Sequence, residues 1–299
     1  MKKVYFDHSA TTPLDKGVKE AMEPYWTEVF GNASSVHSFG QDALKGVDMA
    51  REQMAQFLNC KPNEVVFTSG ATESDNLAVK GLVKKLLNQG VERPHIITTT
   101  VEHDAILEPF MELEKMGVQV DHVPVDSSGV VKIESLKDLI KDNTVLISVM
   151  WVNSESGAIM PIKEIGKIIK KENDRREKTW RETRVKERGD RPTPIYFHTD
   201  ATQALNFVQA DVVANKIDLH SMSAHKIYGP KGVGALYVRD GVPIRCEQRG
   251  GHHEGDRRSG TINVTGIVGL GAAVEQLNVE TQEKENEHVR AVRDYLVEC

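Results

Sequence analysis

The sequence of 299 residues is poor in cysteine: it has only Cys60, Cys246 and Cys299. Because these are few and widely spaced, a disulfide framework and a zinc knuckle are excluded, and we expect no metal site. No apolar stretch approaches the roughly 20 residues that a membrane span needs. The short basic start is not followed by an apolar segment, so we expect no secretory signal. These absences predict a cytoplasmic protein that does not contact a membrane.

The sequence also lacks an excess of basic residues. Its 38 Lys and Arg stand against 44 Asp and Glu, which gives a net charge of -6 and argues against a general nucleic-acid binder. Apolar residues make up 39% of the chain and recur along its whole length, unlike in a disordered protein. The length allows a large core, so we expect a globular enzyme of one or two domains.

Short apolar runs rich in β-branched residues alternate with longer amphipathic segments. This alternation indicates βαβ units, and we expect an α/β fold with a mostly parallel seven-stranded sheet and helices on both faces. Ligands of such sheets bind at the carboxyl ends of the strands. The expected strands are 64–68, 95–99, 119–124, 145–150, 195–198, 217–222 and 233–238. The expected helices are 40–58, 72–89, 105–116, 133–140, 162–171 and 264–298.

Segment 171–194 differs from the rest of the chain, since 9 of its 24 residues are basic and 6 are acidic. We interpret it as a solvated helical extension or loop; the alternative is a surface on which a partner docks.

A first candidate site is the run 65–76, in which an apolar strand leads through small residues into a helix. Free N–H groups at the helix start and the hydroxyls of Ser69 and Thr72 can bind an anion, and Gly70 and Ala71 let a phosphate approach the backbone. The alternative is an ordinary helix capped by Ser69 or Thr72. The run matches neither a Walker loop nor a dinucleotide fingerprint.

Two further candidates follow expected strands. Asp200 can stabilise a cationic ring nitrogen and Gln203 can donate to a ring oxygen, unless Asp200 only caps a helix. Lys226 comes directly after a buried strand, where burial would lower its pKa and supply the neutral amine that a Schiff-base lysine requires. Ser223 and His225 beside this lysine could hold a phosphate.

His103 and the loop 257–261 complete the set. His103 can stack on a flat cofactor and relay protons, unless it belongs to a helix-capping turn. The loop carries two arginines and two hydroxyls and suits a phosphate, unless it is only a solvated loop. Taken together, a phosphate site, a carboxylate, an amine and a stacking histidine are what pyridoxal phosphate requires.

Seven runs of the sequence, in this order, carry a resemblance to a known family: 7–13, 31–37, 68–76, 101–103, 200–203, 223–226 and 258–261. The family is that of the cysteine desulfurases, fold-type-I pyridoxal-phosphate enzymes of the class V aminotransferase group. The similarity covers almost the whole chain, and the combination of runs is highly specific.

The resemblance implies a role for each candidate residue. Lys226 would be the lysine that carries the cofactor and later moves protons, and His103 would stack over the cofactor ring. Asp200 would pair with the pyridine nitrogen and Gln203 would contact the ring oxygen. The phosphate would be held by Ala71, Thr72, Ser223 and His225, together with Thr261 of the neighbouring subunit of a homodimer.

The implied reaction removes sulfur from L-cysteine and leaves L-alanine and an enzyme persulfide. The sulfur would pass to a sulfur-acceptor protein or scaffold for iron–sulfur clusters, or to tRNA thiolation. The implied domains are an N-terminal arm (1–14), a large cofactor-binding domain (15–263) and a helix (264–299). This helix would lead to a small domain that the family carries and that we do not find in this sequence.

The sequence departs from the family at three places. Ser154 replaces an asparagine that contacts the ring oxygen, so we assign it no role, and segment 171–194 is longer than usual. None of the three cysteines lies in the family's nucleophilic cysteine motif. Two alternatives therefore stay open: another fold-type-I pyridoxal-phosphate enzyme, such as an aminotransferase or lyase, or a non-catalytic dimeric scaffold that folds around the cofactor.

Overall fold

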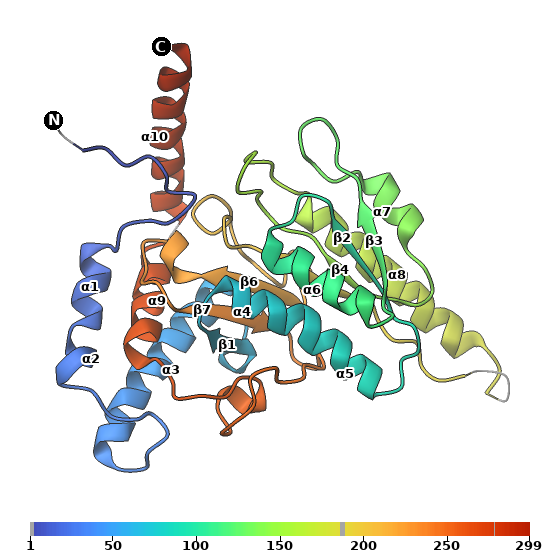
Figure 1. Ribbon diagram of the computed structural model, residues 1–299, viewed down its shortest axis with the longest axis horizontal. Coiled ribbons are helices and arrows are strands. Elements are labelled where there is room, and N and C mark those ends of the chain that lie inside the picture. Colours follow the sequence, from blue (N-terminus) through green and yellow to red (C-terminus); the bar gives the residue numbers. More distant parts are fainter. Residues whose placement is uncertain (1–2, 186–188, 278) are drawn as a thin grey trace.

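The structure is a computed structural model that describes residues 3–185, 189–277 and 279–299. Its strands are β1 (Val65–Thr68), β2 (His95–Thr99), β3 (Gln119–Val123), β4 (Thr144–Ser148), β5 (Tyr196–Asp200), β6 (Leu219–Ser223) and β7 (Gly234–Val238). They form one sheet in the order β1-β7-β6-β5-β4-β2-β3 (Figure 1). The strands from β6 to β3 are parallel, and only β7 runs antiparallel to its neighbours. All expected strands are present with their ends within two residues of the prediction, and the mostly parallel α/β fold is confirmed.

Helices cover both faces of this sheet. The longer ones are α3 (Ser38–Leu58), α6 (Asp104–Lys115), α7 (Ile133–Leu139), α8 (Ile162–Glu182), α9 (Val264–Gln276) and α10 (Val279–Glu298). Adjacent residues of a strand point to opposite faces, so Ile147 belongs to a core with α3, α7, α8 and α9, whereas Leu146 belongs to a core with α6. Two short helices that we did not predict, α1 (Lys16–Met22) and α2 (Pro24–Thr27), lie beside α9.

The helix expected over 72–89 is present as one continuous helical segment with a wider middle turn. It consists of α4 (Ala71–Asn76), a π-helical stretch η2 (Leu77–Gly81) and α5 (Leu82–Asn88). The wider turn lies where the backbone is crowded, because a side chain on Gly81 would come within 2.8 Å of the Arg245 carbonyl oxygen. This segment crosses the same face of the sheet as α6.

The prediction of one helix over 264–298 is wrong. Leu277 leaves the helical region of backbone space (φ -81°, ψ 75°), and its side chain packs against the larger core. The apolar helix α9 is buried against α3, whereas α10 extends away from the rest of the molecule (Figure 1). An apolar helix that must stay in the core and a charged helix that is solvated cannot share one straight axis here.

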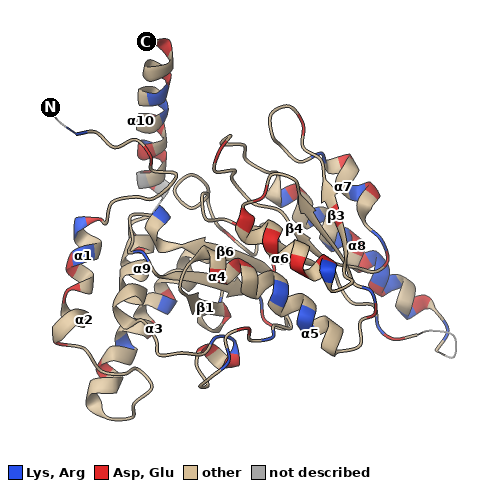
Figure 2. Ribbon diagram, viewed as in Figure 1, with Lys and Arg blue, Asp and Glu red and all other residues tan. Residues whose placement is uncertain are grey.

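The charged segment 171–194 continues α8 as far as Glu182, and residues 186–188 lie outside the described part. Charged residues of both signs occur along α8 (Figure 2). Arg176 is buried, pairs with Glu172 (Nε–Oε1 2.9 Å) and donates to the Thr144 carbonyl oxygen (2.9 Å). The expected helical extension is therefore present, and one of its charges anchors it to the sheet.

The remaining sequence features are local. No helix in the described ranges is long and apolar enough to cross a membrane. Cys60 is partly buried against the larger core, and burial raises the pKa of its thiol to about 12. Cys246 is half-buried and Cys299 is exposed.

Candidate active site

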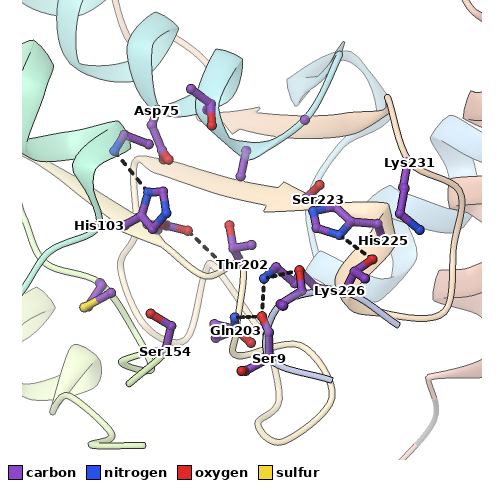
Figure 3. A pocket seen from close by; sticks show the side chains of 18 of the residues that line it. Ser9, Asp75, His103, Ser154, Thr202, Gln203, Ser223, His225, Lys226 and Lys231 are labelled. Carbon is purple, nitrogen blue, oxygen red and sulfur yellow. Dashed lines mark hydrogen bonds between the residues drawn. The ribbon is translucent and has the colours of Figure 1, made fainter. Parts of the chain in front are cut away.

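A cavity of about 800 Å³ lies at the carboxyl edge of the sheet. Strands β1, β2, β4, β5 and β6 all point their carboxyl ends at this edge, so the residues that follow them line one space. Eight of the nine predicted site residues line it, and Figure 3 shows several of them. These eight are Ala71, Thr72, His103, Asp200, Gln203, Ser223, His225 and Lys226. The ninth, Thr261, lines a separate small cavity behind Ser69.

The turn between β1 and α4 leaves helix N–H groups without a side-chain cap. The N-cap position is Gly70, so neither Ser69 nor Thr72 caps the helix as the alternative interpretation required. Gly70 has φ 149°, a conformation that favours glycine, and a Cβ at this position would approach the Ser223 hydroxyl oxygen to 3.6 Å. Among the described hydrogen bonds, none uses the N–H of Ala71 or Thr72 as donor. Both residues line the cavity, and free N–H groups at a helix start suit an anion.

Lys226 ends a short 3-10 helix, η3 (Ala224–Lys226), that follows β6. Its ammonium donates to the carbonyl oxygens of Ser9 and Ala10 in the N-terminal segment (Figure 3). Burial lowers the pKa of Lys226, and the charges of Asp200 and Asp7 only partly oppose this shift. The amine is therefore closer to its neutral form than a solvated lysine.

The N-terminal segment itself was missed as a part of the site. Gln203 donates to the Ser9 carbonyl oxygen (2.7 Å), and Thr12 N–H donates to the His225 carbonyl oxygen (2.9 Å). The His225 Nδ1 lies 3.1 Å from the Thr11 hydroxyl. The run 7–13 contributes to the family resemblance, but no pattern within it predicts where this irregular segment packs.

Asp200 is the last residue of β5, and it is buried. Its Oδ1 accepts from Thr202 N–H (2.9 Å) in a turn, and no helix begins there, so the capping alternative is not what the structure has. Burial raises the pKa of Asp200, whereas hydrogen bonds from Thr202 and the charges of His103 and Lys226 counteract this rise. A cationic group in the cavity would further favour the carboxylate.

His103 serves as the N-cap of α6 and lines the cavity as well. Its Nδ1 accepts the Ala105 N–H (3.0 Å), so a neutral ring carries its proton on Nε2. The helix-capping alternative is therefore present together with the cavity position. Ser154 also lines the cavity, and its hydroxyl donates to Glu155 (3.4 Å).

Two buried carboxyl groups near the cavity were not predicted. Asp75 is fully buried in α4, lines the cavity and has no hydrogen-bond partner on either oxygen among the described residues. Burial, together with the charge of Asp200, raises the pKa of Asp75 well above its usual value. Glu102 accepts from Thr99 Oγ1 (2.8 Å) and from Met150 N–H (2.9 Å), and burial raises its pKa to about 8. The sequence places Glu102 after a strand and Asp75 within a helix, but it does not reveal that they are buried.

The arginines of the loop 257–261 do not line the cavity of their own chain. Arg257 donates to the backbone oxygens of Glu254 (3.0 Å) and Asn63 (2.8 Å). Arg258 pairs with Glu73 (Nε–Oε1 2.8 Å). Both guanidinium groups already have partners within the chain.

A seven-stranded α/β sheet with a half-buried lysine opposite a buried aspartate defines the class, and the chain belongs to the aminotransferase class-V family, which matches residues 4–175 and 185–299. It is 44% identical to cysteine desulfurase IscS of Dictyoglomus turgidum and 46% identical to that of Clostridium botulinum. These matches cover 99% of the chain and 69% and 68% of the relatives. Within class V the chain is therefore one of the pyridoxal-phosphate-dependent cysteine desulfurases.

Solved structures agree with this assignment. A NifS-like protein superposes with a TM-score of 0.89 at 39% identity, over 99% of this chain and 75% of that one. A structure described as SspA in complex with cysteine has a TM-score of 0.82 at 37% identity, over 97% of this chain and 78% of that one.

Proposed function

We propose that the cavity binds pyridoxal 5'-phosphate and that the protein uses it to take the sulfur from L-cysteine and leave L-alanine. The observation that carries this proposal is the meeting of the Lys226 amine, the Asp200 carboxylate and the uncapped start of α4 around one cavity. When bound, pyridoxal phosphate supplies an electron sink for the electrons of bonds broken at the amino acid's carbon atoms.

The donor set fits this cofactor. A phosphate suits the free N–H groups of Ala71 and Thr72 and the polar side chains of Ser223 and His225, because an anion satisfies several donors at once. The unpartnered Thr202 hydroxyl and both unpartnered oxygens of Asp75 fit a cavity made to hold a polar group. We therefore assign the phosphate to Ala71, Thr72, Ser223 and His225.

Asp200, Gln203 and His103 would hold the ring. Asp200 would keep a proton on the pyridine nitrogen, since its buried carboxyl group lines the cavity and a cationic ring nitrogen would favour its ionised form. His103 would lie against the ring with its Nε2–H, because Nδ1 is engaged by the Ala105 N–H. Gln203 would donate to the ring oxygen after giving up its bond to the Ser9 carbonyl oxygen.

Lys226 would be the covalent anchor and would carry protons to and from the substrate. Its lowered pKa makes a neutral amine available, and the carbonyl oxygens of Ser9 and Ala10 would orient that amine. The N-terminal segment would thereby also exclude water from this side of the cavity.

Thr261 would act in a neighbouring copy of the chain. It does not line the main cavity of its own chain, and we propose that it reaches the phosphate of a second subunit in a homodimer, as the family resemblance implies. A cytoplasmic sulfur acceptor or iron–sulfur scaffold protein would receive the sulfur. Residues 1–14 would form the arm, residues 15–263 the large domain, and residues 264–299 a connecting segment made of the two helices α9 and α10.

The test uses the full chain incubated with pyridoxal phosphate and then dialysed. We expect a visible absorbance band that Lys226→Ala abolishes, with Lys231→Ala as the matched control that keeps it, because Lys231 also lines the cavity. L-cysteine with a reductant should then yield alanine and sulfide above the level of free cofactor. A band that survives in Lys226→Ala would remove this lysine from its role, and a band without alanine would favour the scaffold alternative.

A further inference from the structure

Glu73 introduces a negative charge at the edge of the proposed phosphate site. It is the third residue of α4 and lines the cavity, and its carboxylate accepts the Ser69 N–H (2.7 Å). This bond shapes the turn before the helix. A carboxylate beside a phosphate repels it, however, so a positive charge next to Glu73 is needed to offset this repulsion.

Arg258 supplies that charge from 185 residues away in the chain. Its Nε and Nη2 donate to the two oxygens of Glu73 (2.8 and 3.3 Å), and both side chains are largely shielded from water. Burial alone would raise the pKa of Glu73, but the hydrogen bonds from Arg258 and Ser69 outweigh it and hold the pKa below its usual value. The pair is thus ionised, and Glu73 lines the cavity whereas Arg258 does not.

The loop that carries Arg258 is fastened to the sheet by a second ion pair. Glu254 pairs with Arg51 (2.7 Å) and accepts the Phe67 N–H of edge strand β1 (2.9 Å). Gln248 donates to the Ser259 carbonyl oxygen (3.0 Å) on the other side of Arg258. Arg258 is therefore held in place before any ligand arrives, as a preorganised charge must be.

We propose that Arg258 is a positioning residue for the cofactor's phosphate: it neutralises Glu73, so that Glu73 can shape the Ser69 turn without repelling the anion. This inference rests on the proposed function, since it presumes that a phosphate lies at the start of α4. It predicts that removing Arg258 weakens binding of the phosphate part of the cofactor and leaves the ring part unchanged.

The experiment measures the dissociation constants of pyridoxal phosphate and of pyridoxal, which lacks the phosphate, for the full chain freed of cofactor. The quantity of interest is the ratio of the pyridoxal constant to the pyridoxal phosphate constant. We expect Arg258→Gln to lower this ratio about tenfold through the pyridoxal phosphate constant alone. Glu73→Gln/Arg258→Gln should restore the ratio to within threefold of the wild-type value, because no charge is then left unpaired.

Arg257→Gln is the matched control. It removes the same charge from the same loop, but the described hydrogen bonds of Arg257 go to the backbone oxygens of Glu254 and Asn63, neither of which lines the cavity, so the ratio should not change. Arg258→Lys keeps the charge and should stay within threefold of the wild type. This variant keeps the test decisive if Arg258→Gln does not fold, since a tenfold loss in a folded Arg258→Lys protein would contradict charge neutralisation.

Two outcomes overturn the inference. An unchanged ratio in Arg258→Gln, including the case in which pyridoxal phosphate and pyridoxal both bind more weakly by the same factor, would mean that the ion pair only fastens the loop. A double variant no better than Arg258→Gln would exclude repulsion by Glu73. A ratio near one in the wild type would instead overturn the phosphate site of the proposed function, which separates the two failures.

Discussion

Buried acids at the two ends of β5 and β6 have very different surroundings. At the amino end, Asp218 pairs with Arg239 (Nε–Oδ1 2.5 Å) and accepts the Phe197 N–H (2.7 Å). At the carboxyl end, the hydrogen-bond partner of Asp200 among the described residues is a turn N–H, and Asp75 has no described hydrogen-bond partner, although His198 Nε2 lies 3.6 Å from its Oδ1. Asp218, at the end away from the cavity, has its hydrogen-bond and ion-pair partners within the chain. The carboxyl groups that line the cavity have fewer partners, as expected where a bound ligand supplies the missing ones.

The strongest test of this contrast is Asp200→Asn in the protein loaded with pyridoxal phosphate. The amide cannot stabilise a protonated ring nitrogen, so exchange of the α-hydrogen of L-alanine with deuterium should slow by about 100-fold or more. Proton NMR in deuterated buffer measures the exchange. A rate within threefold of the wild type would mean that Asp200 is a structural acid like Asp218.

Asp218→Asn should have the opposite profile. Its loss leaves Arg239 without its partner, and we expect the free energy of unfolding to fall by about 2 kcal/mol, less than for a fully buried pair because Arg239 is half exposed. Urea denaturation checks this value. The α-hydrogen exchange rate of the protein loaded with pyridoxal phosphate should stay the same. A large drop in that rate would contradict a purely structural role for Asp218.

Glu102 predicts a pH dependence of stability. Burial raises its pKa from 4.5 to about 8 in the folded protein, so between these values the folded state binds more protons than the unfolded state. The contribution of Glu102 to the free energy of unfolding is therefore fully present below about pH 4.5. It decreases as the pH rises towards 8, by at most about 1.4 kcal/mol per pH unit. Denaturation at a series of pH values should show a shallower fall for Glu102→Gln, and equal slopes would contradict the shift.

The smallest effect is expected for Asp75→Asn. Because burial favours the protonated form of Asp75, an amide of the same shape should change the free energy of unfolding by less than about 1 kcal/mol. A loss as large as that of Asp218→Asn, measured by the same urea titration, would mean that Asp75 is a charged and paired group after all.

Strand patterns predicted most of the site. Each run that ends in a polar motif, such as the one before Asp200 and the one before Lys226, is a parallel strand whose carboxyl end must reach the same edge. The sheet order was not needed to bring these residues together. The break at Leu277 could not be predicted, because the pattern of 264–298 is helical on both sides and only packing against the core bends the chain.

Contacts between distant segments could not be predicted from the sequence for the same reason. The Arg258–Glu73 pair, the burial of Asp75 and the position of Ser9 against Lys226 each depend on how separate elements pack. A motif such as 257–261 looks suited to a phosphate when seen alone, whereas its arginines have partners elsewhere in the chain.

The alternation of apolar strands and amphipathic helices was enough, by itself, to determine the class of fold and the edge at which polar residues gather, since local periodicity decides which elements form and which of their faces are buried. Tertiary structure alone decided which of those polar groups are desolvated, which are paired and which are left open to a ligand. Burial and pairing depend on how separate elements pack together, and a short run of residues does not specify that packing.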